Sequence, residues 1–208
     1  MTQTPQATPT TPVLHLLAGS NGSGKTTYVD RVLQPVTHLR FVNADVIAAE
    51  RWPEAVQEHA YDASRAAAEE RDRLLAEQAS FITETVFSHP SKVELVRVAV
   101  ELGYRVHLHV ILIPENTSVQ RVEFRVKQGG HTVPEEKIRQ RYSRLWALVA
   151  EARTLAEHTT IYDNSRADTP FRAIATYERG QLVGDADWPE WAPAELVQLR
   201  SPRESMSR

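Results

Sequence analysis

The composition of the chain narrows its class before any motif is considered. It has 208 residues, of which 41% are hydrophobic, no cysteine, and a formal net charge of -3. This length and apolar content suit one globular domain. The nearly balanced charge does not favour nucleic acid or an anionic membrane as a partner, and the lack of cysteine excludes disulfides and thiolate chemistry. We expect a cytoplasmic protein that binds a small molecule.

The two ends of the chain hold few residues that could be buried. The first twelve, "MTQTPQATPTTP", contain three prolines and no charge, and they show neither the basic nor the apolar region of a signal peptide. No apolar run approaches the ~20 residues that a membrane-spanning helix needs. We predict a disordered leader over residues 1–12, one domain over residues 13–200 and a frayed tail over residues 201–208.

Five short apolar runs alternate with helical patterns. The predicted strands are Val13–Ala18, Leu39–Asp45, Ser80–Thr85, Arg105–Ile113 and Thr159–Ser165. Such alternation is typical of a parallel sheet with crossover helices. The sequence therefore predicts an α/β fold, a three-layer α/β/α sandwich with a mainly parallel sheet.

Two helices can be predicted from their ends and their apolar faces. One has Pro90 in its first turn, stops at Gly103, and places Val93, Val96 and Val100 along one side. The other begins at Pro134 and spaces its apolar residues by three or four positions. These are Ile138, Tyr142, Leu145, Val149, Ala152 and Ala156.

The last part of the domain predicts two elements that cover an edge of the sheet. The segment "FRAIATYERGQLVG" is typical of a hairpin that turns at Arg179–Gly180. The segment "WPEWAPAELVQL" predicts a short capped helix. We interpret Trp146, Trp188 and Trp191 as core and edge-covering residues.

The stretch "AGSNGSGKTTY" follows the first predicted strand and opens a predicted helix. It matches Gly-x-x-x-x-Gly-Lys-Thr, the P-loop pattern, in which backbone N–H groups surround a phosphate chain. Lys25 would contact the β- and γ-phosphates, and the Thr26 hydroxyl would bind Mg²⁺. The lysine is informative because only four of the 24 basic residues are lysine. The predicted nucleotide-binding residues are Gly19, Ser20, Asn21, Gly22, Ser23, Gly24, Lys25, Thr26 and Thr27.

Two carboxylates follow the predicted second and third strands. The sequence has no Asn-Lys-x-Asp element to read guanine, so ATP is the favoured nucleotide. Asp45 could take the proton of a substrate hydroxyl, or it could cap the helix that starts near Val46. Glu84 could hold the acceptor or a magnesium-bound water, or it could be a solvated carboxylate at the end of a strand.

A basic segment, which we interpret as a helical lid over residues 116–145, follows the fourth strand. Its Arg121–Arg144 portion has seven Lys and Arg against three Glu, and Gly129-Gly130 divides it. Arg121 and Arg125 share a helix face and are the preferred catalytic arginines. We expect Arg139, Arg141 and Arg144 to be solvated instead. His107 and His109, which share a strand face, are interpreted as packing residues.

These elements resemble the zeta toxin family of P-loop kinases, and in particular its short stand-alone members. The matching segments run from about Val13 to Ser165 and are "GSNGSGKTT", "NAD", "SFITETVFS", "ELGYRVHLHVIL", "RVEFRVKQGGHTVPEEKIRQRY" and "YDNS". The resemblance implies a kinase that uses ATP and Mg²⁺. Characterised members phosphorylate the amino-sugar 3′-hydroxyl of UDP-N-acetylglucosamine, and an antitoxin protein is the partner that such a toxin implies.

The resemblance also implies roles for single residues. Asp45 matches the catalytic base and Glu84 a substrate-side carboxylate, while Arg121 or Arg125 matches a lid arginine. The chain is shorter than the plasmid-borne toxins. It has "ETV" in place of their "EGT", so the substrate-facing threonine of the family is either displaced to Thr85 or absent here. It also has His131 near the position of a second lid arginine.

Three functions remain open at this point. The first is a kinase that transfers the γ-phosphoryl group of ATP to a hydroxyl of a small molecule, with a nucleotide sugar favoured. The second is a kinase that acts on the ends of RNA or DNA, suggested by the basic lid. The third is a nucleotide-dependent binding module without transfer activity.

Overall fold

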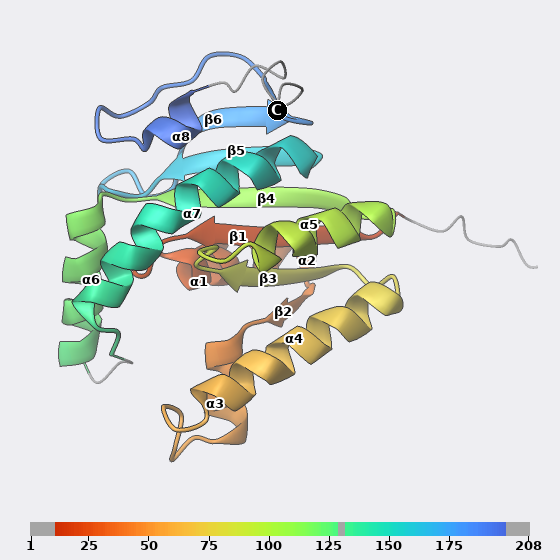
Figure 1. The fold of residues 1–208 in the computed structure, drawn as a ribbon, viewed down its shortest axis with the longest axis vertical. Coiled ribbons are helices and arrows are strands. Elements are labelled where there is room, and N and C mark those ends of the chain that lie inside the picture. The colour runs from red at the N-terminus through yellow and green to blue at the C-terminus, as the bar shows by residue number, and fades with distance from the viewer. Residues whose placement is uncertain (1–10, 129–131, 199–208) are drawn as a thin grey trace, which may run out of the picture.

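The computed structural model describes residues 11–128 and 132–198, which form one seven-stranded sheet with helices on both faces (Figure 1). Its five parallel strands are β1 (Val13–Gly19), β2 (Arg40–Val42), β3 (Phe81–Thr85), β4 (Arg105–Leu112) and β5 (His158–Asp163). The antiparallel strands β6 (Arg172–Glu178) and β7 (Gln181–Leu182) extend the sheet. Along the sheet the strands follow the order β2-β3-β1-β4-β5-β6-β7. The predicted α/β sandwich with a mainly parallel sheet is confirmed.

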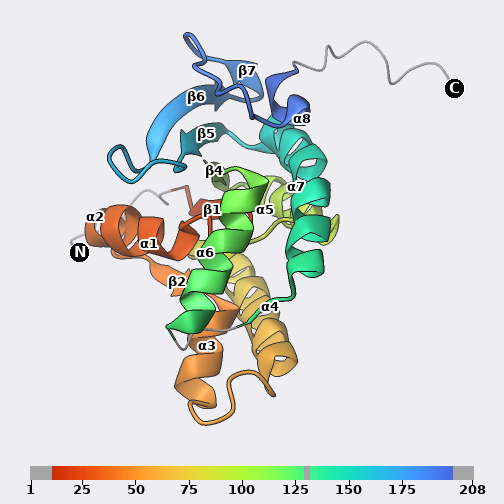
Figure 2. The same cartoon turned by 90° about the vertical axis from the view of Figure 1, so that its left-hand side faces the viewer.

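The helices form two layers of unequal size. One layer contains α1 (Lys25–Tyr28), which continues through a π-helical turn (Val29–Leu33) into α2 (Gln34–Thr37) (Figure 2). The other helices are α3 (Ala44–Arg51), α4 (Ala60–Ala76), α5 (Ser91–Glu101), α6 (Glu115–Lys127), α7 (Glu135–Leu155) and α8 (Ala194–Val197). None of the helices in the described ranges has the length and apolar character that a membrane crossing requires.

Alternation along β1 divides the buried residues between the two faces. Leu14 and Leu16 join the main core beneath α4, α5 and α7. Leu17 packs on the opposite face against Tyr28 and Val29 of the first helical segment. Burial of this apolar surface on both faces is the main stabilising contribution, at roughly 25 cal/mol per Å². This packing holds the first helical segment against β1, the strand that leads into the P-loop.

One predicted boundary and one predicted face differ from the structure. Strand β2 ends at Val42, three residues earlier than expected, because Asn43 already caps α3. On α5 the buried residues are Val93, Val96 and Ala99, whereas Val100 is 41% exposed. The buried positions recur every three residues, so the buried stripe winds away from Val100.

The predicted hairpin and the short helix at the end of the domain are both present, but α8 has no side-chain cap. Arg179 and Gly180 both have positive φ angles, of 47° and 78°, as a tight hairpin turn requires. Trp146 is buried, and Trp188 and Trp191 pack against the main core. The predicted leader and tail fall mostly outside the described residues.

A histidine cluster lies on the sheet face that carries the first helical segment. His15 Nδ1 of β1 lies 3.1 Å from His109 Nε2 of β4, and the His107 ring packs edge-on against the His15 ring. Burial, with a smaller effect of the neighbouring histidines, lowers the pKa of His15 to about 4 and that of His109 to about 3. These histidines therefore pack as neutral rings, in agreement with the predicted packing role of His107 and His109.

The histidine cluster predicts acid sensitivity of the fold. The folded state holds these rings neutral and the unfolded chain protonates them near pH 6.5, so stability should be lost as the pH falls below 6.5. The urea midpoint of the wild type should fall between pH 7 and pH 5, and His15→Leu should make this fall shallower. Replacement of the exposed His89 by Gln is the control, and an unchanged slope in the His15 variant would contradict the assignment.

Candidate functional site

The P-loop lies between the end of β1 and the start of α1, at the carboxyl edge of the parallel strands. Gly22 and Gly24 have φ angles of 71° and 95°, in the left-handed region that favours glycine. A Cβ atom added at Gly24 would lie 2.7 Å from Nδ2 of Asn164. The loop conformation therefore depends on these glycines, as the sequence motif predicts.

Side chains from outside the P-loop fix the direction of its carbonyl groups. A serine and an arginine of α6 and an asparagine after β5 each donate to one of them. These bonds join Ser118 Oγ to Asn21 O (2.5 Å), Arg121 to Gly22 O (3.5 Å) and Asn164 Nδ2 to Ser23 O (2.8 Å). Within the described residues, the N–H groups of Asn21, Gly22 and Gly24 donate no hydrogen bond. This geometry leaves N–H groups available for a phosphate chain.

The ammonium group of Lys25 is buried beneath the loop. It donates to the carbonyl oxygens of Gly19 (3.0 Å) and Ser20 (2.9 Å). Burial lowers the pKa of Lys25, while the nearby carboxylates of Glu84 and Asp45 act in the opposite direction. The lysine thus lies among oxygen acceptors at the place where the motif puts the β- and γ-phosphates.

Glu84 lies beside the P-loop because β1 and β3 are neighbours and Leu17 pairs with Glu84. The Thr26 hydroxyl donates to both oxygens of this carboxylate, at 3.1 and 3.0 Å. Burial raises the pKa of Glu84, although Lys25 and Thr26 act against this effect. A hydroxyl and a carboxylate next to a phosphate site are the hard oxygen donors that Mg²⁺ prefers, so these residues fit the metal. Among the described residues no cluster of three His, Asp or Glu could hold a metal without the phosphates.

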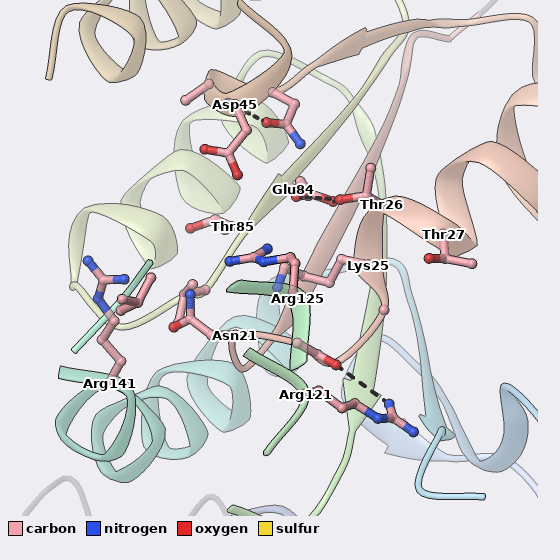
Figure 3. A pocket seen from close by; sticks show the side chains of 16 residues that line it. Asn21, Lys25, Thr26, Thr27, Asp45, Glu84, Thr85, Arg121, Arg125 and Arg141 are labelled. Carbon is pink, nitrogen blue, oxygen red and sulfur yellow. Dashed lines mark hydrogen bonds between the residues drawn. The ribbon is translucent and has the colours of Figure 1, made fainter. Parts of the chain in front are cut away.

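Asp45 lies in the first turn of α3 and does not cap it. The Asn43 side chain accepts from the backbone N–H groups of Asp45 (2.7 Å) and Val46 (3.4 Å). The alternative that Asp45 is the helix cap is therefore wrong. Its carboxylate is exposed, forms no hydrogen bond with the described residues, and points into the cavity beside Thr85 (Figure 3).

The two preferred lid arginines point in different directions. Arg125 extends toward Lys25, whereas the Arg121 guanidinium points away from the cavity centre (Figure 3). Arg121 donates to Asn164 O at 2.9 Å as well as to Gly22 O. Arg125 thus faces the cavity, whereas Arg121 contacts backbone carbonyls of the P-loop and of the segment after β5.

The remaining arginines of the lid divide in the same way. Arg139 forms ion pairs with Glu135 (2.8 Å) and Glu115 (3.4 Å), as a solvated position predicts. Arg144 is exposed. Arg141 instead lines the cavity, so its expected place on a solvated face is wrong (Figure 3). The apolar spacing along α7 could have indicated this side, since the buried Ile138 and Leu145 and the partly buried Tyr142 lie around it.

One cavity of about 580 Å³ brings most of the predicted site residues together. It is lined by Asn21, Gly22, Gly24, Lys25, Thr26, Thr27, Asn43, Ala44, Asp45, Glu84, Thr85, Val86, Arg121, Arg125, Val133 and Arg141. Gly19, Ser20 and Ser23 are not among them, and the buried hydroxyls of Ser20 and Ser23 have no hydrogen-bond partner in the described part of the chain. His131 lies outside the described residues. Of the lining residues, Asn43, Ala44, Val86, Val133 and Arg141 were not predicted.

A P-loop fold with a lysine, a hydroxyl and two carboxylates around one cavity defines a phosphotransferase site of the P-loop kinase class. The zeta toxin family model matches residues 1–172. An uncharacterised protein from Haemophilus influenzae is 30% identical over 125 residues, which are 60% of this chain and 88% of that protein. The chain belongs to the zeta toxin family and is an ATP-dependent kinase.

Solved structures show the same fold at low sequence identity. A chain from the PezAT toxin–antitoxin system of Streptococcus pneumoniae is 15% identical with a TM-score of 0.58, and the match covers 83% of this chain and 74% of that one. A chain of the AvrRxo1-ORF1:ORF2 complex with ATP is 18% identical with a TM-score of 0.60, over 96% of this chain and 67% of that one. The expected family and fold are confirmed.

The contacts of Asn164 predict that it positions the P-loop. Asn164→Ala removes the bond to Ser23 O and the bond that its Oδ1 accepts from Phe171 N–H (3.3 Å). We expect a loss of roughly 1–3 kcal/mol of stability, because buried polar groups lose their partners, and weaker ATP binding. Chemical denaturation and calorimetry with ATP measure the two effects. Asn116→Ala on the exposed side of α6 is the control, and unchanged ATP affinity in the Asn164 variant would contradict the role.

Proposed function

We propose that the chain transfers the γ-phosphoryl group of ATP to a hydroxyl of a small molecule, and that the acceptor is a nucleotide sugar such as UDP-N-acetylglucosamine. One observation supports this proposal above the others. The Asp45 carboxylate is not used by the fold and faces the same cavity as Lys25, Glu84 and Arg125. A toxin–antitoxin system among the fold's neighbours also supports an antitoxin-like protein as a partner.

The residues divide the reaction among them. Asp45 accepts the proton of the acceptor hydroxyl as its oxygen bonds to the γ-phosphorus and the bond to the ADP oxygen breaks. Lys25 and the N–H groups of the P-loop hold the phosphates, and Arg125 stabilises the charge that spreads over the transferred oxygens. Mg²⁺ bound through Thr26 would neutralise the β- and γ-phosphate oxygens. Glu84 orients Thr26 and borders the acceptor side.

The proposed base predicts a loss of transfer without a loss of binding. Asp45→Asn keeps the size of the side chain but removes the proton acceptor, so kcat should fall by about 10²–10⁴-fold. Calorimetry should show an unchanged affinity for ATP, since the carboxylate forms no bond that holds the P-loop. Asp30→Asn on the exposed first helical segment is the control. Full transfer activity of Asp45→Asn would refute the assignment.

Substitutions of Arg121 and Arg125 should have different effects on kcat and KM. Arg125→Gln removes a charge that faces the phosphates, so kcat should fall by about 10²–10³-fold. Arg121→Gln removes bonds to Asn164 O and Gly22 O, so KM for ATP should rise while kcat changes less. Steady-state kinetics against ATP measures both parameters. The reverse pattern would make Arg121 the arginine that acts on the transferred group.

A further inference from the structure

A second hollow adjoins the cavity of the P-loop on the side of α4 and α5. Its volume is about 320 Å³, and it shares Ala44, Glu84, Thr85, Val86 and Arg141 with the first cavity. Its remaining lining comes from the sheet, α4, α5 and the segment after β3. These residues are Leu16, Ser64, Ala67, Arg71, Thr83, Ser88, Lys92 and Leu95. A molecule whose hydroxyl reaches Asp45 can therefore extend past Thr85 into this second hollow.

Three cations from three different helices line the second hollow. Arg71 comes from α4, Lys92 from α5 and Arg141 from α7. Within the described part of the chain, none of these side chains forms an ion pair or a hydrogen bond. Glu84 is the one carboxylate among the lining residues, and it accepts the Thr26 hydroxyl. The positive charge of the hollow is thus not matched by acidic side chains of the lining.

The placement of these cations is unfavourable for the folded chain alone. Lys92 lies in the first turn of α5, where the helix dipole disfavours positive charge. Burial, together with the nearby Arg71, lowers the pKa of Lys92. Burial also lowers the pKa of Arg71, although Asp72 opposes this effect. Half-buried like charges without a partner are the pattern that a bound anion would relieve.

We propose that the second hollow binds an anionic group of the acceptor, a phosphate or a carboxylate, and that Arg71 and Lys92 select acceptors that carry one. The guanidinium of Arg71 can donate two parallel hydrogen bonds to the oxygens of a phosphate or a carboxylate, and the ammonium of Lys92 adds a second positive charge. The hydroxyls of Ser64 and Ser88 line the same hollow and can donate as well. The inference rests on the proposed function for the position of the reacting hydroxyl.

The selection has a direct chemical consequence. A neutral sugar or nucleoside leaves the partly buried Arg71 and Lys92 without an anionic partner, whereas an anionic acceptor pairs with them. The enzyme should therefore prefer anionic acceptors through KM rather than through the reaction step. The preference should extend to a nucleotide sugar, whose diphosphate carries the required charge.

The first experiment follows transfer from labelled ATP. A metabolite extract is separated by anion exchange into a retained and an unretained pool, and each pool is incubated with the enzyme, Mg²⁺ and labelled ATP. We expect the labelled product in the retained pool. Lys92→Met and Arg71→Gln should raise the acceptor KM by tenfold or more and leave the KM for ATP unchanged. The controls are Arg65→Gln, on the exposed side of α4, and Lys137→Met on α7. A labelled neutral acceptor, or an unchanged acceptor KM in both variants, overturns the proposal.

The second experiment does not depend on transfer. The protein is loaded with a non-hydrolysable ATP analogue and Mg²⁺, which fill the P-loop, and inorganic phosphate or acetate is then added. Phosphate, acetate or both should raise the melting temperature of the wild type but not that of Lys92→Met or Arg71→Gln. An equal rise in all proteins overturns the anion site. The remaining outcome is a melting temperature that rises only in the wild type while the first experiment gives no labelled product. That combination supports the anion site and refutes the proposed kinase reaction.

The same variants distinguish a binding role from a structural one. Because Lys92 is placed against the helix dipole and beside Arg71, Lys92→Met should leave the melting temperature of the unliganded protein equal or higher. A fall of several degrees, with acceptor KM unchanged, would assign Lys92 to packing instead. If only phosphate or only acetate raises the melting temperature, that result identifies the anion that the acceptor carries.

Discussion

The outward direction of the P-loop carbonyl groups is the constraint on which the site depends. A loop of small residues has no core of its own, so its conformation must be fixed by neighbours. Lys25 donates hydrogen bonds to the carbonyl oxygens of Gly19 and Ser20. Side chains of α6 and of the segment after β5 donate to the next three carbonyl oxygens, those of residues 21–23. When hydrogen bonds fix the carbonyl groups of a tight loop, its backbone N–H groups remain available to bind an anion. The shape of the anion site therefore depends in part on bonds that Ser118, Arg121 and Asn164 donate to the loop from outside it.

Charge in the site follows from the same arrangement. The buried ammonium of Lys25 lies near the carboxylates of Glu84 and Asp45, which oppose the effect of burial on its pKa. Because Glu84 is held by the Thr26 hydroxyl while Asp45 makes no such bond, the two carboxylates are not equivalent. One is fixed beside the P-loop, and the other is available to a substrate. This difference comes from Asn43, whose amide takes the capping role that would otherwise fall to Asp45.

Local patterns of the sequence were sufficient for the sheet and for the P-loop. Apolar runs give the strands, and the spacing of Gly, Lys and Thr gives the loop, because both depend on residues close together in the chain. Side-chain directions were harder. The spacing of Arg121 and Arg125 puts both on one helix face, yet a long side chain can turn to a backbone carbonyl, as Arg121 does. Helix α4 was not predicted, since its alanine-rich sequence lacks large apolar residues at helical spacing, and the role of Arg71 could not be anticipated without it.

The contacts of α6 with the P-loop limit how the predicted lid could move. Val119 and Val122 of α6 pack with Ile138 of α7 in a small apolar cluster separate from the main core. The two helices therefore contact each other through a cluster that does not depend on the main core. Ser118 and Arg121 nevertheless bind α6 to the P-loop. A motion that lifted the whole helix would break those bonds and release the carbonyls that shape the phosphate site. A closing motion that kept these bonds would have to take place in the part of α6 beyond Arg121, where Arg125 lies.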